Sequence, residues 1–284
     1  MTASRLAVAA ACLLAGLAGA APARADEAPP PEAKLPEAKA PEAGAPEPKR
    51  PEWKGTAGAG LIVLTGNSET TSFTSTAGAS RETFGWILSA KGAAAYGQSR
   101  PPTVPVRAVS TLNGSLVLRL DRKLGEVWSV YVLGGVEADH VASVELRSLG
   151  ELGGAAQWLE LQEGDWQRVA LRTDLGFRYA YEARHQYFGA PGAPLPAVEE
   201  FSPRLGLAFR WGFSKEVFFT EEAEALASVT GPTRVQSKSV SKLSSRLHQG
   251  LTMGVGYTVA HDSRPAPGKA GTDTGLTALL ELAF

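Results

Sequence analysis

The sequence predicts an all-β protein: a transmembrane antiparallel up-and-down β-barrel of about 12 strands over residues 53–284, preceded by a signal peptide and a Pro-rich disordered spacer. Three observations predict it. Apolar and polar residues alternate along many short stretches, tight connections alternate with long ones, and the chain begins with an export signal. After that signal no uncharged run reaches the ~18 residues of a spanning helix. A form that crosses a membrane must therefore be a closed sheet.

The stretch that ends the chain has the simplest alternation. Every second residue is apolar, and smaller or more polar residues lie between, as in a strand with one lipid-facing side: Leu276, Ala278, Leu280, Leu282 and Phe284. In an exported chain this pattern resembles the closing strand of outer-membrane barrels, which the barrel-assembly machinery recognises. We therefore expect Leu280, Leu282 and Phe284 to be the barrel-closing signal. An ordinary amphipathic edge strand is the alternative.

Residues 1–25 are interpreted as a cleaved signal peptide. Arg5 supplies the positive start, residues 6–21 are apolar, and Ala23-Arg24-Ala25 is a small-x-small cleavage site. The only cysteine, Cys12, lies inside this segment, so the mature chain has no thiol. Lipidation at Cys12 is a weaker alternative. The expected location is the outer membrane of a Gram-negative-type bacterium. The net charge of −1 argues against a nucleic-acid partner.

Residues 26–52 are a separate, Pro/Glu/Ala/Lys-rich segment. Proline recurs at every fifth position from Pro31 to Pro51. Such a segment has almost nothing to bury, so it predicts an extended, polyproline-like disordered spacer. We expect a tether on the periplasmic side. The more specific alternative is that the spacer reaches and contacts the cell wall.

Twelve strands are expected in residues 53–284, and their connections alternate in length. The strands are about 55–66, 69–80, 83–97, 106–120, 126–139, 144–161, 166–182, 198–213, 216–229, 234–248, 251–262 and 272–284. The expected tight turns are Arg81-Glu82, 121–125, 162–165, Ser214-Lys215 and Gln249-Gly250. The longer connections are 98–105, 183–197, 230–233 and 263–271, although Gly66-Asn67-Ser68 is tight. Short turns at one end and long loops at the other are typical of outer-membrane barrels.

Two of these strands predict which side chains face outward. Their apolar sets are Val169, Leu171, Leu175, Phe177, Tyr179 and Tyr181 in the first, and Phe201, Leu205, Leu207, Phe209, Trp211 and Phe213 in the second. In a barrel these side chains meet lipid, and the arginines and glycines between them line the lumen. The alternative is a secreted two-sheet β-sandwich acting as a binding module, in which the apolar side would be a buried core.

The same residues resemble a family. Trp53-Lys54-Gly55, followed by a small-residue strand into Thr65-Gly66-Asn67-Ser68-Glu69-Thr70, is similar to the opening signature of the domain of unknown function 481. The run from Lys269 to Thr274, leading into a strand that ends in Phe284, is similar to its closing signature. Lys269 is separated from Thr272 by an insertion, which departs from the pattern, as does Leu282-Ala283 before the end. The resemblance implies a salt-induced outer-membrane protein and no reaction.

The candidate functional site is the lumen. On the expected register, nine charged side chains point inward from four strands: Arg168, Arg172, Arg178, Arg204, Arg210, Glu222, Glu224, Glu137 and Asp139. We interpret them as ion pairs that fill and stiffen a narrow barrel, because buried charges must be paired. A constriction that selects anions is the alternative.

No catalytic residue, metal site or cofactor is predicted. The histidines His140, His185, His248 and His261 are interpreted as loop or strand-end residues. His248 near Ser244 or Ser245 is the nearest Ser-His pair, and it lies at a strand end. The predicted function is a monomeric barrel with a structural or envelope-stress role, whose partners are outer-membrane lipid and the assembly machinery. A narrow diffusion channel for small ions or solutes is the alternative.

Overall fold

The computed structural model describes residues 52–64, 69–100, 106–188 and 194–284. Within these residues the chain forms twelve strands: β1 (Trp53–Leu64), β2 (Glu69–Thr83), β3 (Trp86–Arg100), β4 (Ala108–Lys123), β5 (Trp128–Asp139), β6 (Val144–Glu163), β7 (Trp166–His185), β8 (Pro194–Gly212), β9 (Val217–Ala227), β10 (Val235–His248), β11 (Leu251–Asp262) and β12 (Thr272–Ala283). The predicted signal peptide, the spacer up to residue 51 and the Gly66-Asn67-Ser68 turn lie outside the described residues. None of the described residues belongs to a helix long and apolar enough to cross a membrane.

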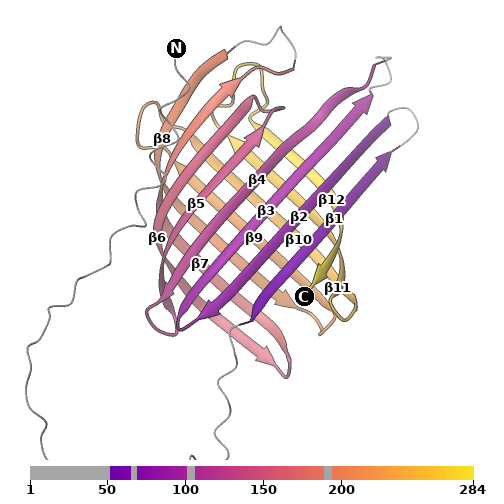
Figure 1. Ribbon diagram of the computed structural model, residues 1–284, viewed down its shortest axis with the longest axis vertical. Helices are drawn as coiled ribbons and strands as arrows, with labels where there is room; N and C mark the ends of the chain where they lie inside the picture. Colours follow the sequence, from indigo (N-terminus) through magenta and orange to yellow (C-terminus); the bar gives the residue numbers. More distant parts are fainter. Residues whose placement is uncertain (1–51, 65–68, 101–105, 189–193) are drawn as a thin grey trace, which may run out of the picture. The chain divides into compact units, whose positions relative to one another are not determined.

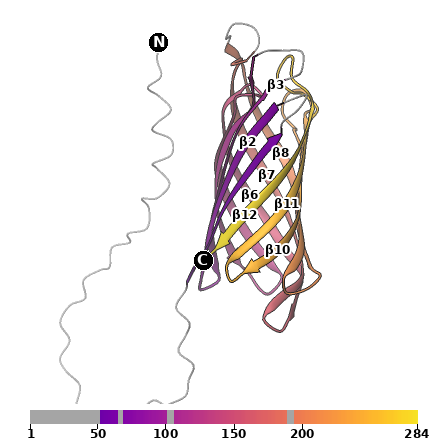
Figure 2. The same cartoon turned by 90° about the vertical axis from the view of Figure 1, so that its right-hand side faces the viewer.

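The strands form one closed antiparallel barrel, which Figures 1 and 2 show from two sides. Each strand pairs with its sequence neighbour, and β1 pairs with β12 to close the ring. Phe284 ends beside the start of β1, where the backbone N–H of Gly55 donates to the Phe284 carbonyl at 2.7 Å and the Phe284 N–H donates back at 3.0 Å. A closed sheet leaves no unpaired edge, which is the condition for crossing lipid.

The barrel is broader in Figure 1 than after the quarter turn in Figure 2, so its cross-section is flattened. In Figure 1 the strands β2, β3 and β4 form the near wall, and β9 and β10 lie behind them. β3 and β9 are six strands apart in both directions around the ring of twelve. Their lumenal side chains therefore face one another across the short dimension.

The predicted count of twelve strands is confirmed, but several predicted turns are wrong. Arg81-Glu82 lies inside β2, and the chain turns at Phe84 and Gly85, which have positive φ of 47° and 77°. The predicted turn at 121–125 starts too early, because pairing with β5 extends β4 as far as Lys123. An Asp-Arg-Lys-Leu-Gly run resembles a turn locally. Cross-strand hydrogen bonds outweigh that local preference.

The expected difference in connection length between the two ends of the barrel is confirmed in the described residues. One end, here the turn end, has connections of two to four residues at 84–85, 124–127, 164–165, 213–216 and 249–250. At the opposite, loop end, the connection predicted at 183–197 narrows to 186–193 because β7 and β8 pair further than expected. The connections predicted at 98–105 and 230–233 become 101–107 and 228–234, whereas 263–271 is as predicted. The β5–β6 connection, 140–143, is short.

Two neighbouring turns are joined by an ion pair. Lys215 Nζ, between β8 and β9, lies 2.5 Å from Asp165 Oδ2, between β6 and β7. The hydrogen bond and charge of Lys215 lower the pKa of Asp165 below its ordinary value. Both side chains are exposed, so the pair contributes little to stability.

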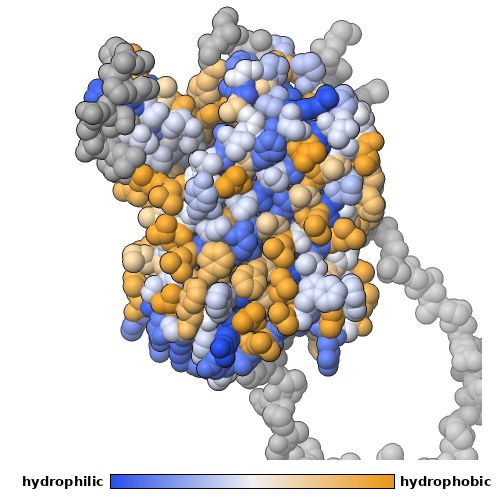
Figure 3. All heavy atoms as spheres, turned by 180° about the vertical axis from the view of Figure 1, so that it is seen from behind, coloured by the Kyte–Doolittle hydropathy of each residue, from blue (hydrophilic) through white to orange (hydrophobic). Residues whose placement is uncertain are grey.

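The outer face is apolar, and this excludes the sandwich alternative. Leu175, Phe177 and Leu205 are 66%, 56% and 57% exposed, whereas a sandwich would bury them. Figure 3 shows broad apolar areas on the back of the barrel. Exposed aromatic side chains gather near the turn end, as in barrels whose aromatic belts lie at the lipid–water interface: Trp86, Trp128, Trp158, Trp211 and Phe213.

One acidic side chain breaks the apolar pattern. The register places Glu221 of β9 on the outer face, beside Ser239 and Ser241 of β10. Ser239 donates a hydrogen bond to one oxygen of the Glu221 carboxylate at 2.5 Å, and Ser241 donates to the other. These serines supply donors where lipid offers none. They explain how a carboxylate is tolerated there.

The register predicts different costs for charges at adjacent positions of β8. Leu207 faces outward, whereas Ala208 faces the lumen and lines a cavity there. We expect Leu207→Arg to reduce the free energy of unfolding in lipid vesicles by about 2–4 kcal/mol, and Ala208→Arg by far less. Urea titration followed by tryptophan fluorescence measures both. Equal losses in the two variants would contradict the register.

Candidate functional site: the charged lumen

The lumen holds a continuous set of ion pairs between β4 and β9. Arg119 of β4 binds Asp121 on its own strand at 2.9 Å and Asp174 of β7 at 2.6 Å. Arg172 of β7 binds the same two carboxylates, at 2.6 and 3.0 Å. Since β4 and β7 are separated by two strands, these four side chains join parts of the wall that are not neighbours.

A second group of charges continues this set. Arg178 of β7 and Arg204 of β8 both bind Glu151 of β6, at 2.8 and 3.2 Å, and both bind Glu224 of β9, at 3.1 and 2.8 Å. The Glu151 side chain is fully buried and also accepts a 2.6 Å hydrogen bond from the Tyr131 hydroxyl. Every polar atom of that carboxylate is thus engaged.

The two groups together are called the central network. Its charges balance, with four arginines and four carboxylates: Arg119, Arg172, Arg178, Arg204, Asp121, Asp174, Glu151 and Glu224. The Arg119 guanidinium also lies 3.8 Å from the centre of the Tyr131 ring. A Cβ at Gly153 or Gly176 would lie 2.6 Å from the Tyr131 hydroxyl, so these glycines make room for it. The network fills its side of the barrel without a net charge.

A further cluster lies nearer the loop end. Arg147, Arg184 and Arg234 all bind Glu182, whose side chain is 3% exposed. Arg234, just before β10, also binds Glu200 at 3.2 Å and binds Asp262 of β11. These bonds connect β6, β7, β8 and β11 around one buried cation. They narrow the lumen at this end.

The opposite side of the lumen is more open. The inward positions of β1, β2 and β3 carry mostly small side chains: Thr56, Gly58, Gly60, Thr74, Thr76, Gly78, Ala93 and Ala95. From β3, Lys91 reaches across to Glu222 of β9, with Nζ 3.1 Å from both carboxylate oxygens. Both side chains remain largely exposed, at 68% and 63%. Space large enough for water therefore surrounds this ion pair.

A cavity of about 280 Å³, here the lumenal chamber, lies on the turn side of the central network. Gln157, Gln167, Thr220 and Glu222 contribute to its lining, together with Arg172 and Arg210. Arg210 stacks on Phe218, with the guanidinium carbon 3.8 Å from the ring centre. Its Nε is buried and has no hydrogen-bond partner in the described part of the chain.

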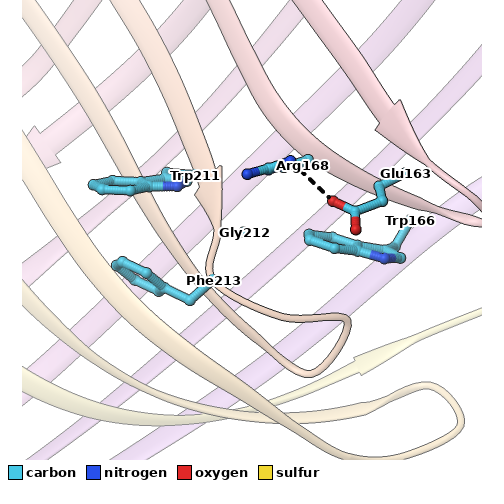
Figure 4. Close-up of a pocket in the computed structure, with 6 residues that line it drawn as sticks. All are labelled: Glu163, Trp166, Arg168, Trp211, Gly212 and Phe213. Atoms are coloured by element: carbon cyan, nitrogen blue, oxygen red, sulfur yellow. Dashed lines mark ion pairs between the residues drawn. The ribbon is translucent and has the colours of Figure 1, made fainter.

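Figure 4 shows a second cavity, of about 300 Å³, at the turn end of β7 and β8. Arg168 lies 3.3 Å from Glu163 there, and both side chains are more than half exposed. The aromatic rings of Trp166, Trp211 and Phe213 surround the pair. Arg168 is thus placed at the rim rather than in the central network.

The other predicted lumenal charges have varied partners. Arg172, Arg178, Arg204 and Glu224 belong to the central network, and Glu137 binds Arg147 at 3.1 Å. Among Arg172, Arg204, Arg210, Glu222 and Glu224, all predicted to face the lumen, the only ion pair in the described structure is Arg204–Glu224. Asp139 instead accepts a 2.9 Å hydrogen bond from the Ala142 backbone in the β5–β6 connection.

Sequence reasoning missed half of the network. Arg119, Asp121, Glu151 and Asp174 were absent from the candidate set, as were Lys91, Arg147, Glu182 and Arg234. Asp121 was missed because it was assigned to a turn. The period-two pattern of β4 and β6 would have found Arg119, Arg147 and Glu151, because they occupy inward positions.

Two of the histidines have defined contacts in the described residues. His140 stacks on Tyr187 with ring centres 4.2 Å apart, and His261 Nδ1 lies 2.9 Å from the Thr272 hydroxyl. No group of three or more His, Cys, Asp or Glu side chains within the described ranges is arranged to hold a metal.

The fold and the lumen define a class: a transmembrane β-barrel whose interior is partly filled by ion pairs. The chain belongs to the family described as "Protein of unknown function, DUF481", whose profile matches residues 57–284. No curated protein matches the chain.

Several solved structures are similar at low identity. The translocator domain of autotransporter NalP from Neisseria meningitidis is 12% identical, with coverage of 82% of this chain and 86% of that chain and a TM-score of 0.43. The KdgM porin is 12% identical, with coverage of 82% and 99% and a TM-score of 0.41. The NanC porin is 10% identical, with coverage of 81% and 97% and a TM-score of 0.41.

Proposed function

We propose that the protein is a barrel of the bacterial outer membrane that provides a narrow polar passage for small ions or solutes. The observation that carries this proposal is the exposure of Lys91 and Glu222, which lie near the middle of β3 and β9. Water reaches these two charges beside the central network. The closed sheet and the apolar outer face support the membrane location, with the turn end toward the periplasm.

A second candidate is a structural or envelope-stress barrel that conducts nothing. The central network favours it, because its matched charges fill the lumen between β4 and β9. Both candidates involve a monomer without catalysis. In both, lipid contacts the outer face, and the assembly machinery recognises Leu280, Leu282 and Phe284.

Planar-bilayer recording of the purified protein tests the passage. We expect small, steady openings in the wild type. Lys91→Gln leaves the Glu222 carboxylate unneutralised and should shift selectivity toward cations, whereas Glu222→Gln should shift it toward anions. Lys123→Gln, which removes a cation from an ion pair at the turn end, is the matched control.

The outcomes separate the two candidates. Folded protein without openings would support the structural barrel. Openings whose selectivity is equal in Lys91→Gln and Glu222→Gln would show that ions pass without meeting this pair.

A further inference from the structure

We propose that Arg210 anchors a binding site for small organic carboxylates in the lumenal chamber. The inference rests on the proposed passage for access, and it names the class of molecule that the passage holds.

The first argument is that Arg210 lacks a carboxylate partner among the described residues. Arg210 has no carboxylate within ion-pair distance among the described residues, whereas the arginines of the central network each bind two or more. Its Nε is buried without a hydrogen-bond partner. The Arg210 guanidinium carbon lies 3.8 Å from the centre of the Phe218 ring, and this contact holds the side chain in place. A cation inside a barrel without a carboxylate partner is costly unless water or an anion solvates it, so an anionic ligand is favoured.

The second argument is that the neighbouring charges are already occupied. Arg172, which also lines the chamber, is held by Asp121 and Asp174. Glu222 is held by Lys91. Arg172 is therefore less available to a ligand than Arg210, and Glu222 does not neutralise Arg210.

The third argument comes from residues that lie side by side on three adjacent strands, β6, β7 and β8. Glu160 of β6 pairs with Ala170 of β7, which pairs with Arg210 of β8. Adjacent strands are about 4.8 Å apart, so Glu160 and Arg210 are separated by about 10 Å at the backbone. No ion pair joins them in the described structure, and the residue between them, Ala170, is small.

These features suit a carboxylate more than a spherical anion. A planar guanidinium binds a planar carboxylate through two parallel hydrogen bonds, which chloride does not form. The rest of such a molecule would meet Gln157, Gln167 and Thr220, and a hydroxyl or ammonium group would point toward Glu160. At ~30 Å³ per water, 280 Å³ is about nine waters of space, which is enough for a small carboxylate.

The test is a binding measurement that does not depend on conduction. Trifluoroacetate is added to the full-length protein in detergent, and its fluorine NMR line broadening is followed while acetate or chloride competes. We expect acetate to reverse the broadening at a lower concentration than chloride. Arg210→Gln should weaken binding about tenfold, the effect of about 1.4 kcal/mol. Arg168→Gln, which removes an arginine that already has a carboxylate partner, should bind like the wild type.

The two proposals fail separately. If the protein broadens the trifluoroacetate line but does not conduct, the binding site is supported and the proposed passage is contradicted. Openings in bilayers without broadening overturn the site alone. Equal broadening in wild type and in a folded Arg210→Gln variant, with folding checked by heat-modifiable gel mobility, also overturns it. Arg210→Lys keeps the charge without the planar donors, and we expect intermediate binding.

Discussion

Replacing Glu151 with glutamine is expected to destabilise the barrel by about 3–5 kcal/mol, because a buried ion pair loses one partner and leaves uncompensated charge. Glu151 has no exposed side-chain surface, and both Arg178 and Arg204 bind it. After Glu151→Gln these arginines share Glu224, and the central network carries one excess positive charge. The free energy of unfolding in lipid vesicles, from urea titration, measures the loss.

Glu222→Gln is the matched control for this experiment. Glu222 also pairs across the lumen, but its side chain is 63% exposed, so its removal should cost about 0–1 kcal/mol. The double variant Glu151→Gln/Arg178→Gln removes one charge of each sign and should recover part of the loss. A single Glu151→Gln variant as stable as Glu222→Gln would show that the central network is solvated rather than buried.

Deleting Phe284 is expected to reduce folded barrel far more than deleting residues 27–49. The β1–β12 seam has only four registered pairs, from Thr56↔Ala283 to Ala59↔Leu280, against nine or more at every other seam. The two backbone hydrogen bonds between Phe284 and Gly55 extend it. Their loss costs about 1–3 kcal/mol at the seam where the barrel closes.

The measurement is the fraction of heat-modifiable protein in membranes of the two deletion strains. Gly55→Leu is a useful companion, because a Cβ at Gly55 would lie 2.4 Å from the Phe284 ring and would displace it while leaving the backbone hydrogen bonds in place. It should therefore give an intermediate loss. Equal amounts of folded barrel after the two deletions would argue that the seam does not depend on Phe284.

The direction of most side chains was predictable from the sequence alone. Leu175 and Phe177 face outward, and Arg172 and Arg178 face inward, because side chains alternate across a strand whatever its partners are. The same local rule predicted twelve strands, and the lengths of the connections predicted the difference between the turn end and the loop end. Strand ends were less predictable, as Asp121 shows, since cross-strand pairing decides them.

Only the tertiary structure decided which charges meet. The partners Arg119 and Asp174 lie 55 residues apart in sequence, and Lys91 and Glu222 lie 131 apart. Their contacts depend on the closure of the ring, on its flattened cross-section and on the relative stagger of strands, none of which period-two alternation encodes. The sequence determined that the lumen is charged. Closure and stagger decided that one side is filled by matched pairs and that Lys91 and Glu222 are exposed to water. They also decided that Arg210 has no carboxylate partner among the described residues.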